Sequence, residues 1–206
     1  MRDSLTCLMQ SVAIGVEAFE SGRAFFAGRD PERPACLIVD LRMPGQSGLE
    51  VQECLAAEDE PIPVIFVSGH GDIPTAVRAM KSGAVEFLTK PFSEEVLLRC
   101  VRRALRKDQL RRREQRENAD LRARLEQLTA REVQVLDLVV QGASNKAVAR
   151  ELGISPKTVE LHRANVMRKM RAGSLADLVQ MYVRLDPDWA AGAAGAGAAA
   201  RPGAER

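Results

Sequence analysis

The chain has 206 residues, 28% of them charged, and this length allows one or two domains with cores of their own. No apolar run approaches the roughly 18 residues of a membrane helix and the start lacks a signal-peptide pattern, so we expect a cytoplasmic protein away from membranes. Residues 1–105 carry 11 Lys and Arg against 15 Asp and Glu, whereas residues 106–186 carry 17 against 11, which indicates that only the second part approaches a polyanion. No C-x-x-C pair or nearby His accompanies the cysteines, so we expect reduced thiols at Cys7, Cys36, Cys54 and Cys100.

Short apolar runs in the first half predict strands at residues 35–39, 64–67 and 86–88. The first two do not alternate polar and apolar residues, which is typical of strands buried on both faces of a parallel sheet. A weaker strand is expected at 16–19, and helical patterns occupy residues 4–12, 48–57, 74–80 and 94–105. Strand and helix alternate, so the pattern predicts an open α/β sheet.

A charged segment without Gly or Pro follows at residues 106–124. A thin apolar stripe begins near its C-terminal end and continues beyond it, with Leu121, Leu125 and Leu128. This pattern predicts a solvated linker helix; a coiled-coil dimer is the alternative, although the stripe covers few heptads. The next segment, 125–188, has helical patterns throughout, and the Ala- and Gly-rich tail at 189–206 is expected to be disordered.

Residues 129–171 contain the signals of a helix-turn-helix unit between Asn145 and Ala164. A capping box from Thr129 to Glu132 starts one helix, which Gly142 ends. A short helix at 145–152 then reaches the turn at Gly153, and Ser155 with Pro156 starts the next helix. Small and apolar residues where two helices must cross predict the DNA-binding motif, whose second helix enters the major groove. An ordinary helical bundle with a basic face is the alternative.

The outward residues of this unit suit DNA, with Lys and Arg neutralising phosphates, Glu160 accepting from a cytosine amino group and Leu161 touching a thymine methyl group. For His162, a packing or capping role is an equal alternative. The expected DNA-binding residues are Thr129, Asn145, Lys146, Ser155, Lys157, Thr158, Glu160, Leu161, His162, Arg163, Asn165 and Lys169. In a last helix at 174–185, the residues expected to form a dimer surface or to complete the core are Leu175, Leu178, Val179 and Tyr182.

Residues 128–136 (Leu-Thr-Ala-Arg-Glu-Val-Gln-Val-Leu), the pair Asn145-Lys146 and residues 154–170 (Ile-Ser-Pro-Lys-Thr-Val-Glu-Leu-His-Arg-Ala-Asn-Val-Met-Arg-Lys-Met) closely resemble the LuxR-type DNA-binding domain of the NarL/FixJ response regulators. The match is most similar to the FixJ branch. This resemblance implies an all-α four-helix domain that binds double-stranded DNA as a dimer through its last helix.

Three polar residues follow the predicted strands of the first half: Asp40, Ser68 and Lys90. In open α/β sheets, sites form at the carboxyl ends of strands, so parallel neighbours bring these side chains to one edge. A carboxylate, a hydroxyl and an ammonium together suit phosphoryl capture, with Asp40 as nucleophile. Taken singly, a strand-end Asp would more often be a helix cap or turn residue, and a lone Ser or Lys there would usually have no function.

Residues 37–48 (Leu-Ile-Val-Asp-Leu-Arg-Met-Pro-Gly-Gln-Ser-Gly), 64–72 (Val-Ile-Phe-Val-Ser-Gly-His-Gly-Asp) and 84–92 (Ala-Val-Glu-Phe-Leu-Thr-Lys-Pro-Phe) resemble the flavodoxin-like receiver domain of response regulators, here at 1–105. The resemblance implies that Asp40 is phosphorylated and that Lys90 binds the phosphoryl group. It also implies that Ser68 and Phe87 form the activation switch and that the Lys90–Pro91 bond is cis.

One departure from the receiver pattern concerns Mg²⁺. The chain begins inside the first helix of the pattern, so the first strand and the acidic pair that would follow it are missing. Asp40 and the backbone carbonyl of Arg42 alone make an incomplete Mg²⁺ site, and loss of a central strand would expose two strand edges. Either the start is assigned too late, which we favour because the remaining residues suit the chemistry, or the receiver is degenerate.

The sequence thus predicts a two-component response regulator and transcription factor, not an enzyme, whose Asp40 is phosphorylated by a sensor histidine kinase. The expected partners are double-stranded DNA, that kinase and a second copy bound to DNA, with RNA polymerase as a further candidate. A phosphorylation-independent regulator with a dimerising or partner-binding first half is one alternative. A phosphatase of the haloacid dehalogenase type is another, disfavoured because Arg42 stands where such enzymes carry a second Asp.

Overall fold

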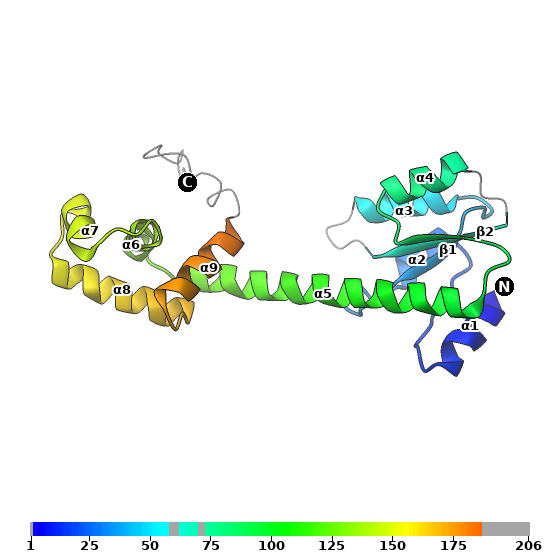
Figure 1. Cartoon of the computed structure of the whole chain (residues 1–206), viewed down its shortest axis with the longest axis horizontal. Helices are drawn as coiled ribbons and strands as arrows, with labels where there is room; N and C mark the ends of the chain where they lie inside the picture. The colour runs from blue at the N-terminus through cyan, green and yellow to red at the C-terminus, as the bar shows by residue number, and fades with distance from the viewer. Residues whose placement is uncertain (1, 58–61, 70–72, 187–206) are drawn as a thin grey trace. The chain divides into compact units, whose positions relative to one another are not determined.

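The computed structural model describes residues 2–57, 62–69 and 73–186, and the chain divides into two compact units, Met1–Arg113 and Glu114–Arg206. The elements of each unit surround cores of their own (Figure 1). The expected disorder at 189–206 and residues 70–72 of the second receiver-like motif lie outside the described residues. No helix within the described ranges is long and apolar enough to span a bilayer.

The first unit is built on a parallel sheet of β1 (Leu37–Asp40), β2 (Val64–Ser68) and β3 (Glu86–Thr89), in the order β1-β2-β3. All residues of the central strand β2 are buried, which confirms the prediction from its unbroken apolar run. Asp40 pairs with Val67, and Ser68 pairs with Thr89, so the carboxyl ends of the strands lie at one edge.

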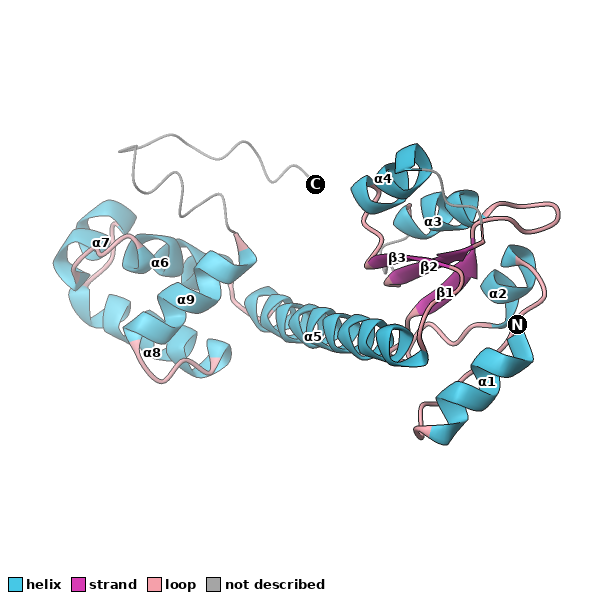
Figure 2. Cartoon of the chain, turned by 45° about the vertical axis from the view of Figure 1, so that its right-hand side comes forward, coloured by secondary structure: helices cyan, strands magenta, loops and turns pink. Residues whose placement is uncertain are grey.

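Helices cover both faces of this sheet, as Figure 2 shows for α3 and α4 on one side and α5 on the other. Because side chains alternate along a strand, Phe66 of β2 joins one core with α2, α3 and α4, whereas Ile65 joins a second core with α1 and α5. The helices are α1 (Arg2–Ser11), α2 (Gly22–Gly28), α3 (Gly48–Ala56), α4 (Ile73–Lys81) and α5 (Glu94–Glu126). The predicted α/β fold is therefore confirmed.

The strand predicted at residues 16–19 is absent, and that prediction was wrong. The chain leaves α1 through Ala13 at φ 56°, where the Ile14 amide donates to the Met9 carbonyl at 2.9 Å. Ile14 and Val16 pack against the core shared with α5. Packing against this core therefore explains why the segment is apolar, and among the described residues the segment pairs with no strand.

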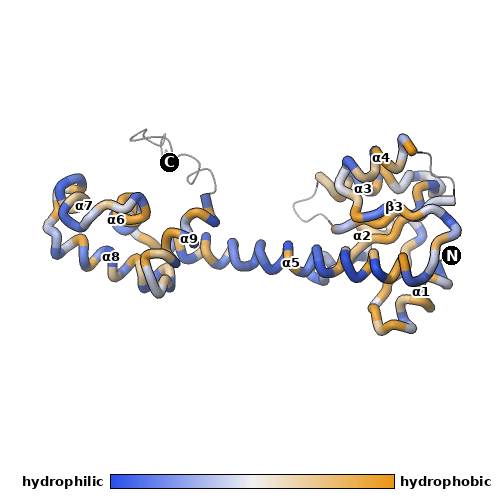
Figure 3. Tube along the Cα trace, in the orientation of Figure 1, coloured by the Kyte–Doolittle hydropathy of each residue, from blue (hydrophilic) through white to orange (hydrophobic). Residues whose placement is uncertain are grey.

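Helix α5 is continuous through the segment predicted as a linker, and Figure 3 shows its middle turns as predominantly hydrophilic. Its part within the first unit is anchored by Asp108, a fully buried carboxylate that accepts from the Ala35 amide at 3.0 Å and from Arg112 Nε at 2.7 Å. Arg112 also donates to the Pro31 carbonyl at 2.6 Å. Burial and, to a lesser degree, the Asp108 charge raise the pKa of the Cys36 thiol to about 12, so this cysteine stays protonated.

The second unit contains α6 (Ala130–Val140), α7 (Asn145–Leu152), α8 (Pro156–Met170) and α9 (Leu175–Leu185), as the helical patterns predicted. The capping box of Thr129 and Glu132 starts α6, and Ser155 caps α8. Gly153 has φ 66° and ends α7 in the left-handed conformation that glycine adopts without a steric penalty. The predicted helix-turn-helix geometry is therefore present.

The apolar stripe at the end of α5 is used within this second unit. Leu121 and Leu128 are buried, and Leu125 and Leu128 belong to the same core as α6 and α8. Leu178 and Tyr182 of α9 are also buried there, and the Tyr182 hydroxyl lies 2.6 Å from Asp137 Oδ1. Leu178 and Tyr182 therefore complete the core, which is one of the two roles expected for them, and as buried side chains they present little area to a second copy.

Candidate phosphoacceptor site and candidate nucleic-acid interface

Asp40 stands at the carboxyl end of β1 beside Lys90. The Lys90 ammonium donates to Asp40 Oδ2 at 2.7 Å, and the Arg42 amide donates to Asp40 Oδ1 at 3.0 Å. The side chains of Asp40 and Lys90 are 24% and 30% exposed, so the pair is open to a small reactant from solvent. A nucleophilic carboxylate and a cation able to bind phosphoryl oxygens are thus in direct contact.

Ser68 and Phe87 lie on the other two strands of the sheet, Ser68 at the carboxyl end of β2 and Phe87 within β3. Ser68 ends β2 and is buried, and its carbonyl accepts from the Lys90 amide at 2.8 Å. The Phe87 ring of β3 stacks on Phe66 with centroids 6.1 Å apart. The parallel register therefore brings Asp40, Ser68 and Lys90 together as expected, and the Lys90–Pro91 bond is cis.

The loop after Asp40 is held by close packing at Gly48. A Cβ atom at this position would lie 2.6 Å from the Asp40 carbonyl oxygen and 3.0 Å from the Phe66 ring. The Ser47 and Glu50 capping box starts α3 here, and hydrogen bonds from the Ser47 backbone and hydroxyl hold the pKa of the Glu50 carboxyl below its usual value. Sequence reasoning did not identify Gly48 because only the fold places it against the strand end.

The described residues do not fit the Mg²⁺ site that the resemblance to receiver domains implies. Mg²⁺ takes carboxylate oxygens, phosphate and waters in octahedral geometry. Nowhere in the described part of the chain do three His, Cys, Asp or Glu side chains gather at metal-binding spacing. Asp40 and the Arg42 carbonyl are therefore an incomplete donor set among the described residues.

One face of α8 is exposed over its whole length. Its residues recur at helical spacing and comprise Lys157, Glu160, Leu161, Ala164 and Arg168. Leu161 is 62% exposed and lies in the middle of this face. Three of these residues were expected at the DNA. Arg168 was not among the predicted DNA contacts, although its spacing of seven from Leu161 places it on the same face of the helix.

Several other expected DNA-binding side chains are engaged within the unit. Thr129 and Ser155 accept backbone hydrogen bonds as helix caps, and the Thr158 hydroxyl lies 2.8 Å from that of Ser155. His162 and Asn165 are partly buried, and His162 Nδ1 is buried with no hydrogen-bond partner among the described residues. Lys146 is exposed on α7.

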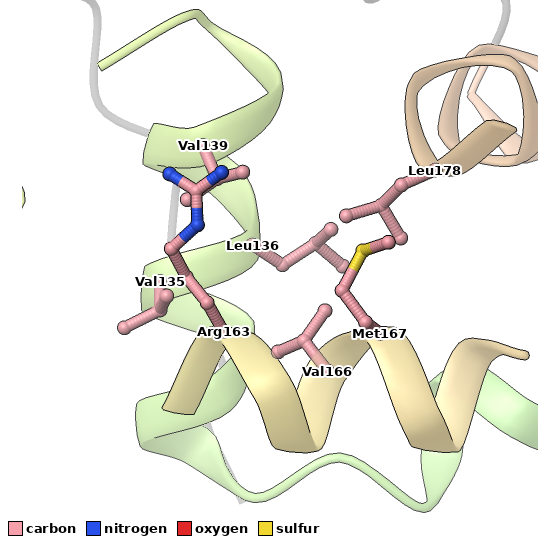
Figure 4. Close-up of a pocket in the computed structure, with 7 residues that line it drawn as sticks. All are labelled: Val135, Leu136, Val139, Arg163, Val166, Met167 and Leu178. Atoms are coloured by element: carbon pink, nitrogen blue, oxygen red, sulfur yellow. The ribbon is translucent and has the colours of Figure 1, made fainter. Parts of the chain in front are cut away.

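Arg163 faces the core side of α8. Figure 4 shows its side chain beside Val135 and Val139 of α6, in an apolar pocket between α6, α8 and α9. Its Nη1 donates to Asn145 Oδ1 at 3.0 Å, which links α8 to the first residue of α7.

Lys169 is also turned inward. Its ammonium lies 2.6 Å from Oε2 of the buried Glu132 and 3.1 Å from the Gln127 carbonyl oxygen. Burial raises the pKa of the Glu132 carboxyl, but hydrogen bonds from Lys169 and Thr129 outweigh this and hold the pKa below its usual value. Lys169 therefore joins the ends of α5, α6 and α8, where the sequence had suggested a DNA contact.

Comparison with known families assigns both units. Residues 1–102 match the response regulator receiver domain, and residues 126–182 match the bacterial regulatory proteins of the luxR family. These matches cover the strand-end site and the helix-turn-helix unit, respectively.

Individual proteins are similar over both units together. Nodulation protein W of Bradyrhizobium diazoefficiens is 50% identical over 181 residues, which cover 88% of this chain and 80% of that protein. Transcriptional regulatory protein FixJ of Rhizobium meliloti is 44% identical over 181 residues, covering 88% and 89%. The solved structure of response regulator StyR has a TM-score of 0.81 at 44% identity, covering 88% of this chain and 92% of that one. Full-length FixJ from B. japonicum has a TM-score of 0.52 at 41% identity, covering 90% and 91%.

Proposed function

Since this chain belongs to the two-component response regulators that join a receiver domain to a LuxR-type DNA-binding domain, we propose that a phosphoryl group on Asp40 controls its DNA binding. Members of this family are transcriptional regulators, not enzymes, that bind DNA through the LuxR-type domain and interact with sensor histidine kinases. The chain acts in the cytoplasm, where its DNA target lies.

The contact between Lys90 Nζ and Asp40 Oδ2 at 2.7 Å is the observation that carries the receiver part of the proposal. An Asp40 oxygen attacks phosphorus, the bond from phosphorus to the donor's histidine nitrogen breaks, and Lys90 neutralises the transferred phosphoryl oxygens. The Ser68 hydroxyl, at the end of the adjacent strand, donates to the phosphoryl group. The Phe87 ring on β3, which stacks on Phe66, repacks in response. The change shifts a population between two states of the regulator.

Labelling of the full chain with radioactive acetyl phosphate tests this assignment. We expect label on the wild type, none on Asp40→Asn and normal label on Asp30→Asn, a matched control with an exposed carboxylate. The assay is run with and without Mg²⁺, since the described residues form no Mg²⁺ site. Absence of label under both conditions, or label that survives Asp40→Asn, would favour the phosphorylation-independent regulator instead.

The exposed stripe of α8 supports the DNA part of the proposal. Lys157 contacts a phosphate, Glu160 accepts from a cytosine amino group and Leu161 packs on a thymine methyl group. Weaker polar contacts around this stripe come from residues that are partly buried or lie on α7, namely Asn145, Lys146, His162 and Asn165.

Binding to a double-stranded oligonucleotide selected from a random pool separates these roles. Lys157→Ala is expected to weaken binding to all sequences and to reduce the slope of log affinity against log salt by about 0.9. Glu160→Ala is expected to relax the preference at one base pair instead. If both variants lose amide protection in α8, or if their effects are exchanged, the surface assignment is wrong.

Dimerisation on DNA is proposed through the remaining exposed part of α9. Leu175 is 41% exposed and Val179 is partly buried, one turn apart on the same helix. A second copy covering these side chains would leave the buried Leu178 undisturbed. Sedimentation of the DNA complex tests this, and Leu175→Glu is expected to halve the number of protein chains bound per DNA site. RNA polymerase would contact a surface that neither DNA nor this dimer uses.

A further inference from the structure

The hydrogen bond between Arg163 and Asn145 connects two residues that the sequence presents as independent DNA contacts. The Arg163 side chain lies on the same side of α8 as the buried Val159 and Val166, opposite the exposed stripe of Lys157, Leu161 and Arg168. Figure 4 shows it extended beside α6. From this position Arg163 acts on the DNA surface through the residue that it binds.

The chemistry of a guanidinium decides how the Asn145 amide is oriented. A guanidinium donates hydrogen bonds and accepts none, so the amide oxygen must face Arg163, as the distance of 3.0 Å from Nη1 to Oδ1 shows. The –NH₂ group of Asn145 is then directed away from Arg163. An amide turned the other way would present its oxygen to a phosphate and be repelled.

Asn145 is the first residue of α7, the helix that precedes the turn of the helix-turn-helix. In such units the first helix crosses the DNA backbone while the second lies in the major groove. An amide donor at this place meets a phosphate oxygen.

We propose that Arg163 is a positioning residue that holds the Asn145 amide with its –NH₂ group toward a DNA phosphate. The inference rests on the proposed DNA interface and assigns Arg163 an indirect part in it. Arg163 also ties α7 to α8, so the amide is presented in fixed register with the exposed stripe.

Salt dependence distinguishes an indirect role from a direct phosphate contact. A cation at a phosphate releases counterions, so its removal lowers the slope of log affinity against log salt by about 0.9. A neutral amide donor releases few. Arg163→Met in the full chain is therefore expected to weaken binding of the selected oligonucleotide about ten-fold at unchanged slope.

Arg168→Met is the matched control, because it removes the same charge from the exposed side of the same helix. We expect it to lower the slope, and Arg163→Met not to. In an Asn145→Ala background, Arg163→Met is expected to cause no further loss, since its partner is already gone. Equal slope changes for both arginines, or independent losses at Arg163 and Asn145, would overturn the inference.

Two outcomes outside this comparison are also decisive. If the wild type binds no oligonucleotide, the proposed DNA interface itself fails; if it binds and Arg163→Met behaves like Arg168→Met, only the positioning role fails. Should Arg163→Met lose amide protection in α7 and α8, Asn145→Ala alone carries the test. That variant must lose affinity at unchanged slope, and wild-type affinity would refute the inference.

Discussion

Replacing Lys169 by Met removes the cation that neutralises a buried carboxylate. Glu132 is 3% exposed, and its Oε2 accepts from Lys169 Nζ at 2.6 Å and from the Thr129 amide at 2.8 Å. Breaking one side of a buried ion pair costs about 3–5 kcal/mol, because the remaining charge is left in a poorly solvating environment. Lys169 keeps 21% of its side chain exposed and Glu132 keeps the Thr129 amide, so we expect about 3 kcal/mol.

This loss is large for a domain whose free energy of unfolding is of the order of 5–15 kcal/mol. It also depends on pH. The folded-state pKa of Glu132 lies below its unfolded value, so its contribution is complete above about pH 4.3 and is lost as pH falls through the folded-state pKa. The difference between the wild type and Lys169→Met is therefore expected to shrink below about pH 4.

Hydrogen exchange measured by mass spectrometry gives the stability of this unit separately, from peptides of α6 and α8. Lys157→Met is the control, because it removes an exposed lysine from the same helix and is expected to leave protection unchanged. The reasoning is refuted if Lys169→Met keeps wild-type protection but lowers the salt slope of DNA binding by about 0.9, as a direct phosphate contact would.

Three further predictions concern buried polar groups and glycines. Asp108→Asn is expected to destabilise the first unit by about 3 kcal/mol at pH 7, because Arg112 loses its carboxylate partner. Burial raises the pKa of Asp108, but its hydrogen bonds outweigh this and hold the pKa below its usual value, so the difference in urea midpoint between wild type and variant should vanish well below pH 4. An equal difference at pH 3 and pH 7 would contradict this prediction. Gly48→Ala is expected to lower both the urea midpoint and Asp40 labelling, because its Cβ would meet the Asp40 carbonyl oxygen at 2.6 Å; unchanged labelling would count against this. Gly153→Ala is expected to cost about 1 kcal/mol, because a Cβ atom there would meet no neighbour and only the φ of 66° opposes the substitution. A loss of amide protection above about 2 kcal/mol would disagree with this expectation.

Local signals in the sequence predicted most of the fold. The unbroken apolar run at 64–67 became the central buried strand, and the Thr129 capping box and the Ser155-Pro156 start became helix ends where expected. The convergence of Asp40, Ser68 and Lys90 was also predictable, because parallel strands place their carboxyl ends at one edge. Each of these signals involves residues close in sequence or a general rule of topology.

The features that the sequence predicted wrongly or left open depend on residues far away in the chain. Val16 packs against the core contributed by α5 and Phe19 against the core on the other face of the sheet, and no strand pairs with residues 16–19 among the described residues. Leu178 and Tyr182 have the same helical spacing whether they face a second copy or their own core. Only the packed arrangement of α6, α8 and α9 distinguishes the two.

The order of the elements, the helix-turn-helix and the strand-end Asp40 follow from the sequence by itself, because backbone preferences and apolar periodicity are local properties. The tertiary structure alone decided which cations of α8 face solvent. Arg163 and Lys169 bind Asn145 and Glu132, which lie 18 and 37 positions away in the chain, whereas Arg168 is exposed on the solvent-facing side of α8. A charged side chain turns toward whatever counter-charge or acceptor folding brings to it, and that neighbour is set by the packing of distant helices.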